Sequence, residues 1–168
     1  MFGTAIIAKS CLNGTLITSL SHNCITAITI PTPKALFHLI AMYARPSVPS
    51  PFSALSLLLL NHPYLFPNII IGLDSNAKHP LWNSRFEDKK GQELTNILSR
   101  LPLSVANRPI SKLSSIPSNT TFIDITLTGD NISFSQWSFL DYQSLSDLTP
   151  HHLHDLTQLL PITELSQT

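Results

Sequence analysis

The sequence predicts an α/β fold of the α+β type, in which two mixed β-sheets pack face to face and helices flank them. Segments rich in isoleucine and threonine recur in both halves of the chain and predict strands. Two segments carry helix signals, so the element order is strands, helix, strand, helix and strands again. A chain of 168 residues is long enough for one such domain with a real core.

The first half is expected to form an antiparallel meander that leads into a helix. Four segments, partly alternating in polarity and separated by turn signals, predict strands over 3–9, 14–20, 24–30 and 35–44. A proline-rich loop follows at 44–52. The prolines on either side can open and close a helix over 52–62.

The second half is expected to contain one central strand and one helix before further strands. Residues 68–74 are hydrophobic on both faces, which is typical of a central strand. Acidic residues at the start of 87–100, with leucine and isoleucine at helical spacing, predict a helix. A short strand at 103–107 and a β-rich end over 121–129, 134–142 and 151–160 complete the prediction.

The composition narrows the class of protein. Hydrophobic residues make up 43% of the chain and charged residues 12%, which argues against disorder. The formal net charge is zero, so nucleic-acid binding would need a local basic patch. No signal peptide or apolar run of membrane-spanning length is evident, and we expect an intracellular chain, nuclear or cytoplasmic, without a membrane partner.

The two cysteines, Cys11 and Cys24, do not form a recognisable site. They lie thirteen positions apart, which fits neither a zinc site nor a disulfide framework. We expect two free, buried thiols in a reducing compartment.

The acidic residues are distributed unevenly. Residues 1–73 contain no Asp or Glu, and all ten carboxylates lie from Asp74 onward. Any metal site that needs two or more carboxylates must therefore be built from the second half of this chain.

The segment that follows the predicted central strand, GLDSNAKHPLW, suggests a phosphodiester-cleaving site. Asp74 and Asn76 stand two apart, and along a strand such residues point to the same side. An Asp can orient or deprotonate an attacking water, an Asn amide can donate to a phosphate oxygen, and oxygen ligands suit Mg²⁺. The alternative is an ordinary turn, which Asp and Asn also favour. His79 and Trp82 are interpreted as structural and packing residues.

Five pieces in order carry a resemblance to a known family. The first is Asp74-Ser-Asn76-Ala with His79-Pro-Leu-Trp82, and the second is the helix that contains Gly91-Gln-Glu-Leu94. The other three are the strand LSVAN, the Ile-Asp-Ile-Thr at 123–126 and the strand SQWSFLD, after which comes Ser146-Asp147. Together with Tyr43 they resemble the endonuclease domain of non-LTR retrotransposons, a branch of the endonuclease/exonuclease/phosphatase superfamily. The resemblance runs from about residue 3 to 160.

This resemblance implies a DNase I-like four-layer α/β sandwich that lacks its first strands. Residues 1–168 would form a single domain, incomplete at the N-terminus. It also implies DNA as the partner, Mg²⁺ as a weakly bound cofactor, no small-molecule cofactor, and a reverse transcriptase domain in a full-length element.

The resemblance also implies roles for individual residues. Asp74 would position the nucleophile, and Asp124 would orient a catalytic histidine. Asn76 and Tyr43 would contact the phosphate, with Lys78 and Ser146 as further substrate-binding residues. The alternative for Lys78 is a solvated loop. Asp147 would belong to the metal site.

Two departures from the family pattern weaken the expected chemistry. Leu148 stands where the closing Ser-Asp-His motif has its histidine, and leucine can neither donate nor accept a proton. The family's opening Asn and Gln-Glu metal ligands have no counterpart in the acid-free residues 1–73. We therefore expect impaired nicking of target DNA. The alternatives are a non-catalytic DNA- or protein-binding remnant and a phosphatase of the same superfamily, against which the His-Pro-Leu-Trp string argues.

Overall fold

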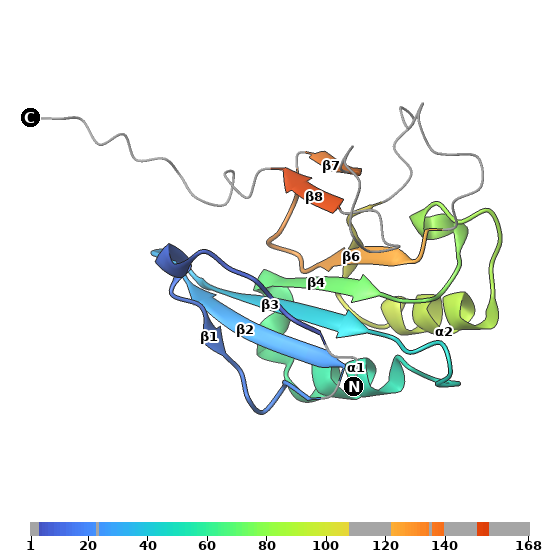
Figure 1. The fold of residues 1–168 in the computed structure, drawn as a ribbon, viewed down its shortest axis with the longest axis horizontal. Helices are drawn as coiled ribbons and strands as arrows, with labels where there is room; N and C mark the ends of the chain where they lie inside the picture. Colours follow the sequence, from blue (N-terminus) through green and yellow to red (C-terminus); the bar gives the residue numbers. More distant parts are fainter. Residues whose placement is uncertain (1–3, 23, 108–121, 135, 140–150, 155–168) are drawn as a thin grey trace, which may run out of the picture.

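The computed structural model describes residues 4–22, 24–107, 122–134, 136–139 and 151–154, and its centre is a mixed six-stranded sheet (Figure 1). The strand order is β1-β2-β3-β4-β6-β5. The strands are β1 (Thr15–Leu16), β2 (Ile25–Pro31), β3 (Leu36–Tyr43), β4 (Ile69–Asp74), β5 (Ser104–Val105) and β6 (Asp124–Thr128). Only β3 and β4 run parallel to each other; the remaining neighbours in this sheet are antiparallel.

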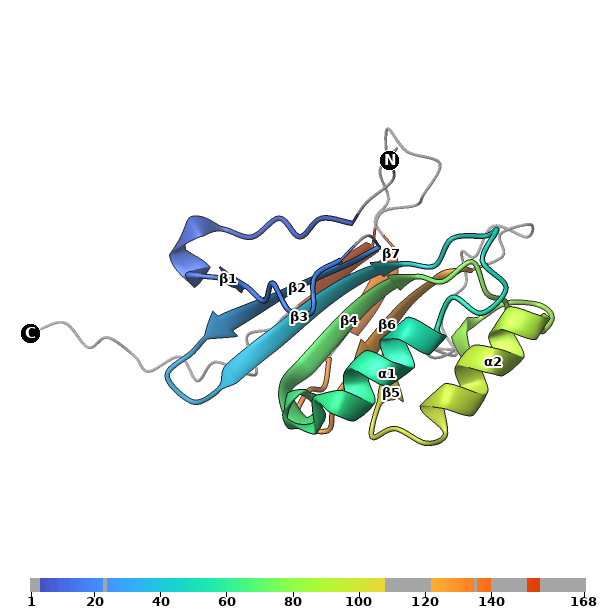
Figure 2. The same ribbon diagram turned by 90° about the horizontal axis from the view of Figure 1, so that it is seen from below.

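Helices cover one face of this sheet. They are α1 (Ser53–Asn61) and α2 (Lys89–Leu98). The described residues also form three short 3₁₀ turns, η1 (Ser10–Leu12), η2 (Pro63–Asn68) and η3 (Pro80–Trp82). A two-stranded sheet of β7 (Gln136–Phe139) and β8 (His151–His154) lies on the opposite face (Figures 1 and 2). The predicted α/β class, with sheets and flanking helices, is confirmed. No helix in these ranges is long and apolar enough to cross a membrane.

The hydrophobic core lies between the six-stranded sheet and the two helices. Alternate residues of β3, Ile40 and Met42, and of β4, Ile71 and Leu73, pack against leucines of α1 and α2. The residues between them, such as Tyr43, point to the other face of the sheet. Strand alternation therefore separates a packed face from a face that can carry polar groups.

The order of the predicted elements is confirmed, but the strand expected at 3–9 is wrong, and the strand expected at 14–20 is reduced to β1 over Thr15–Leu16. The strands expected at 24–30, 35–44, 68–74 and 121–129 are β2, β3, β4 and β6, and both helices are present. Residues 4–9 form no strand; Thr4 contacts β2 through the Thr26 hydroxyl, which donates to the Thr4 carbonyl at 2.9 Å. On the side of β2 away from β3, β1 already pairs with Ile28 and Thr29. This segment therefore has no continuous strand edge to pair with.

The expectation for the cysteines is half right. Both thiols are free, but Cys11 is exposed and Cys24 is half-buried. Cys11 lies in η1, which has no buried residue, and Cys24 precedes the first residue of β2. The two cysteines therefore lie toward opposite ends of β2, because η1 leads into β1, which pairs with the far part of that strand.

Candidate active site

The strand register places Tyr43, Asp74 and Asp124 side by side. In the parallel pair β3–β4, Tyr43 is opposite Asp74, and in the antiparallel pair β4–β6, Asp74 is opposite Asp124. Directly opposed residues point to the same face of a sheet. All three are half-buried and lie outside the core cluster. A phenol and two carboxylates thus form a row across three strands, at the end where β3 and β4 finish (Figure 1).

Asn76 lies next to this row because of a turn after β4, and not because of strand periodicity. Strand β4 ends at Asp74, and Asn76 takes a left-handed backbone conformation with φ of 47°. Its side chain folds back, so that Nδ2 donates to Asp74 Oδ1 at 3.0 Å and to the Ala44 carbonyl at 3.1 Å. The prediction that strand periodicity aligns Asp74 with Asn76 is therefore wrong, and a turn brings them together instead.

The geometry of Asn76 orients Asp74. An amide nitrogen carries two hydrogens, and in Asn76 both have protein acceptors. One of them fixes an oxygen of the Asp74 carboxylate, and the other ties the turn to the end of β3. This arrangement supports a positioning role for Asn76, whereas its predicted contact with a phosphate would require one of these bonds to be exchanged.

The environment of Asp74 raises the pKa of its carboxyl group from 3.8 to about 6. Burial is the main cause, the neighbouring charge of Asp124 adds to it, and a backbone hydrogen bond from Asn76 opposes it. A carboxylate with such a pKa is largely ionised at neutral pH and yet basic enough to accept a proton from water in general base catalysis.

A buried amide, Asn107, holds the end of β6 that carries Asp124. Its Nδ2 donates to the Asp124 carbonyl, and its Oδ1 accepts from the Thr126 N–H, both at 3.0 Å. This side chain is 1% exposed and continues the ladder that β5 begins. Ser75 adds a second tie, because its backbone N–H donates to the Ile123 carbonyl at 2.9 Å. Sequence reasoning missed both residues; the only local signal is that LSVAN ends in Asn.

The loop after β4 is built around Trp82 and His79. Trp82 is fully buried, and its Nε1 donates to the Ala77 carbonyl at 3.1 Å. His79 Nδ1 accepts from the Leu81 N–H at 2.9 Å, its Nε2 lies 3.1 Å from Glu87 Oε1, and its ring packs on Trp82 with centroids 5.1 Å apart. Both ring nitrogens thus have protein partners, in agreement with the structural interpretation of His79.

Asp88 and Gly91 attach this loop to α2. Asp88 caps the helix by accepting from the Gly91 N–H at 2.7 Å, and the same oxygen accepts from the Lys78 N–H at 3.1 Å. A Cβ on Gly91 would lie 2.0 Å from the Lys78 carbonyl oxygen, so only glycine allows this approach. The segment that carries the site is therefore fixed against a rigid element.

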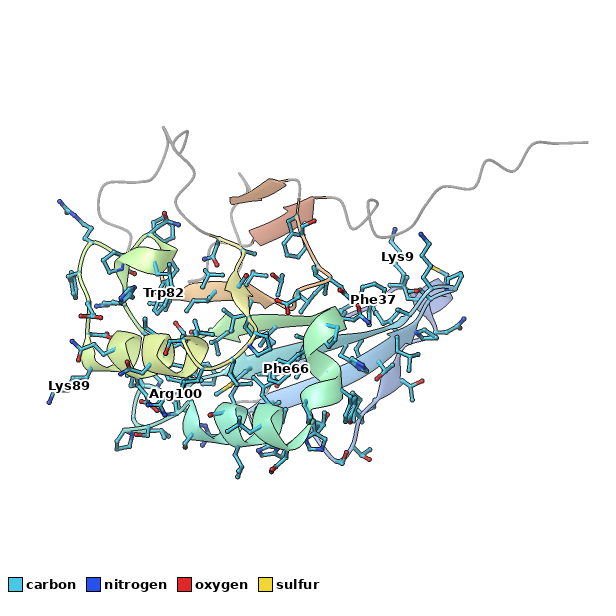
Figure 3. The ribbon with its side chains drawn as sticks, turned by 180° about the vertical axis from the view of Figure 1, so that it is seen from behind. Lys9, Phe37, Phe66, Trp82, Lys89 and Arg100 are labelled. Carbon is cyan, nitrogen blue, oxygen red and sulfur yellow. The ribbon has the colours of Figure 1, made fainter. Side chains whose placement is uncertain are left out.

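The lysines near the site are held by the protein. Lys78 Nζ lies 4.9 Å from the centroid of the Phe86 ring, a cation–π contact. Lys90 Nζ donates to the Arg45 carbonyl at 3.2 Å and to the Pro46 carbonyl at 2.8 Å. Figure 3 shows Lys89 and Trp82 at the end of the molecule opposite Lys9 and Phe37. Substrate binding by Lys78 would require its ammonium to leave the Phe86 ring.

The described residues supply part of a metal site. Within the described ranges, no group of three or more His, Cys, Asp or Glu residues could hold a metal ion. Asp74 and Asp124 nevertheless supply two adjacent carboxylates, which fits a hard cation such as Mg²⁺ that keeps several waters. The predicted residues Ser146, Asp147 and Leu148 lie outside the described residues.

Comparisons with known proteins place this geometry in context. A family model described as "Endonuclease-reverse transcriptase" matches residues 37–152, which include the whole row. Among solved structures, the endonuclease domain of TRAS1, a telomere-specific non-LTR retrotransposon, matches with a TM-score of 0.68 at 20% identity, which shows a shared fold. The match covers 82% of this chain and 64% of that domain, so the chain spans less than two thirds of it. A search of curated proteins gave no match.

Proposed function

Because the chain belongs to the endonuclease–reverse transcriptase family, we propose that its row of Tyr43, Asp74 and Asp124 is the reaction centre of a retrotransposon endonuclease-like domain that hydrolyses phosphodiester bonds in DNA. The observation that carries the proposal is the position and acidity of Asp74. It is the middle residue of the row, its carboxylate is oriented by Asn76, and its pKa is raised to about 6.

Asp74 is the group that orients the attacking water and accepts its proton. The Asn76 amide fixes one carboxylate oxygen at 3.0 Å, which leaves the other for the water. Tyr43 carries a phenolic hydroxyl on the same face and can donate it to a non-bridging phosphate oxygen. Asp74 thus acts on the attacking water and Tyr43 on a phosphate oxygen, so the two residues assist different atoms of one hydrolysis.

Asp74 and Asp124 are the described residues that would hold a divalent ion, with Asp147 as the further ligand suggested by the resemblance. Such an ion would neutralise charge at the phosphorus and the leaving oxygen. Without it, the mutual repulsion of the two carboxylates contributes to the raised pKa of Asp74. A bound cation should therefore lower this pKa, which is a readout of metal binding that does not depend on activity.

We propose that nicking is impaired in this chain. Leu148 replaces the histidine of the family motif, and acid–base help of this kind contributes about 10²–10⁴-fold to a rate. In addition, residues 1–73 contribute no carboxylate, so the carboxylate ligands of this chain are limited to residues from Asp74 onward. The two deficits affect different parts of the reaction and should compound.

A plasmid-nicking assay tests the proposal. We expect no measurable nicking by the unaltered chain with Mg²⁺ and little recovery in Leu148→His alone, since the metal would still be weakly held. Raising the Mg²⁺ concentration should reveal nicking by Leu148→His. Asp74→Asn in that background should abolish it. The rate should fall as the pH becomes low enough to protonate Asp74, at a pH below the value of about 6 for the metal-free carboxyl, because the bound ion lowers this pKa.

Four outcomes would contradict this account. Robust Mg²⁺-dependent nicking by the unaltered chain that is lost in Asp74→Ala would show that another group replaces the absent histidine. Nicking by Leu148→His that is indifferent to Asp74→Asn would remove the reaction centre from this row. DNA binding without nicking under every condition would favour the non-catalytic alternative, and hydrolysis of small phosphate monoesters alone would favour the phosphatase alternative.

A further inference from the structure

A hollow of about 180 Å³ opens where β2 begins and β3 ends, and the proposed reaction does not use it. Its walls combine apolar side chains, among them Ile25, Met42 and Val48, with the polar groups of Cys24 and Arg45. Such a mixture of apolar walls and a few polar groups is typical of a ligand site.

The hollow adjoins the proposed reaction centre. Tyr43 lines it, is opposite Asp74 in the sheet, and donates its backbone N–H to the Cys24 carbonyl at 2.9 Å. Two strand spacings separate β2 from β4, which is about 10 Å. The apolar walls Ile25 and Met42 lie on the helix-covered side of the sheet and Asp74 lies on the other side, so the hollow and the row meet at the strand ends, where Tyr43 lines the hollow. A DNA strand advances about 3.4 Å per nucleotide along the helix axis, so a strand that crosses the ends of β2, β3 and β4 covers this spacing in about three nucleotides.

The charge of the hollow suits a polyanion. All its lining residues precede Asp74, so none of them is a carboxylate. Arg45 Nε donates to Cys24 Sγ at 3.1 Å, which holds the guanidinium beside the hollow. Lys90 Nζ binds the carbonyls of Arg45 and Pro46 and clamps the backbone of the same loop. A guanidinium held in this way loses little freedom on binding a phosphate.

We propose that this hollow is a subsite for the DNA strand that flanks the scissile phosphate. Arg45 binds a backbone phosphate of that strand, and the apolar walls hold the adjoining sugar or base. The proposal rests on the proposed function, because the reaction centre at Asp74 determines where the flanking strand lies. It assigns to Arg45 a substrate-binding role that none of the family motifs includes.

The two cysteines provide a direct test in the unaltered chain. Cys24 lines the hollow, whereas Cys11 is exposed toward the other end of the sheet and serves as the internal control. Alkylation by iodoacetamide is followed at each cysteine by mass spectrometry, with and without a short duplex oligonucleotide, in a chelator so that nothing is cleaved. We expect DNA to slow alkylation of Cys24 in proportion to the fraction of protein bound and to leave Cys11 unchanged.

A second measurement tests the contact with phosphate. One phosphate contact contributes about 0.9 to the slope of log affinity against log salt, so between about 50 and about 200 mM salt the unaltered chain should lose about 3.5-fold more affinity than Arg45→Gln. Arg45→Lys keeps the charge and should keep the slope. Arg100→Gln is the matched control, because this exposed arginine follows the far end of α2, about 15 Å from its first turn.

The result separates this proposal from the proposed function. Equal protection of both cysteines, protection of neither, or an unchanged salt slope in Arg45→Gln would overturn the subsite. Nicking by Leu148→His at raised Mg²⁺ without protection of Cys24 would contradict the subsite and leave the proposed reaction centre standing. Protection of Cys24 with no nicking in any variant would support the subsite and contradict the catalytic proposal alone.

Discussion

Replacing Asp74 by asparagine should stabilise the protein at neutral pH. Folding raises the pKa of this carboxyl from 3.8 to about 6, so between these values the folded protein keeps a proton that the unfolded chain has released. The free energy of unfolding must therefore fall as the pH rises through this window. Above it, the ionised carboxylate imposes its full cost on the folded state.

The shift sets the size of the effect. At about 1.36 kcal/mol for each pKa unit, the ceiling is about 3 kcal/mol, and solvent screening of a half-buried group reduces it to about 1–2 kcal/mol. Asparagine has nearly the same shape, and its Oδ1 can still accept from the Asn76 amide. Asp74→Asn should thus be close to the wild type in stability at low pH and more stable above pH 6.

Urea unfolding of both proteins from about pH 4.5 to about pH 8 measures this difference. Carboxylates remote from this site contribute equally to both proteins, so subtracting the two curves leaves the contribution of Asp74, including its interaction with Asp124. A difference that stays constant with pH would refute the reasoning, as would a wild type that gains stability relative to the variant as the pH rises.

Three further changes test neighbouring features. Asp124→Asn should reduce the pH dependence of the unfolding free energy that Asp74 causes without abolishing it, because burial is the larger cause of the raised pKa. Urea unfolding over the same pH range measures this change. Asn76→Ala should cost about 1 kcal/mol more stability than Asn76→Gly in thermal melts, because alanine resists a positive φ while both variants lose the same side-chain bonds. Gly91→Ala should destabilise by about 3 kcal/mol or more through its backbone clash, whereas Gly72→Ala, with no atom within 4 Å of the added Cβ, should change the melting temperature little.

Local patterns were sufficient to predict the elements that end at the site. The apolar run before Asp74 and the turn residues after it predict both β4 and its last residue, and the same reasoning places Tyr43 and Asp124 at strand ends. The register that aligns these three residues cannot be obtained in this way, because it depends on which strands become neighbours.

Side-chain bonds between distant segments account for the remaining differences. Asn107 completes the ladder of β6 through its amide, which no periodicity in the sequence indicates. Residues 4–9 have the composition of a strand, but β1 already occupies part of the edge they would need. Both the bonds of Asn107 and the absence of a strand at residues 4–9 depend on tertiary contacts, which local propensity does not predict.

The order of the strands has a consequence for how the row of Tyr43, Asp74 and Asp124 forms during folding. Thirty-one positions separate Tyr43 from Asp74, and fifty separate Asp74 from Asp124, although both pairs are neighbours in the sheet. Such distant pairings form slowly, because the loops between them must close first. The β2–β3 hairpin can therefore assemble early, while the row of three residues requires β4 and β6 to have docked. A partly folded chain would retain local structure without the aligned row, so the proposed cleavage of DNA would require β3, β4 and β6 to be docked together.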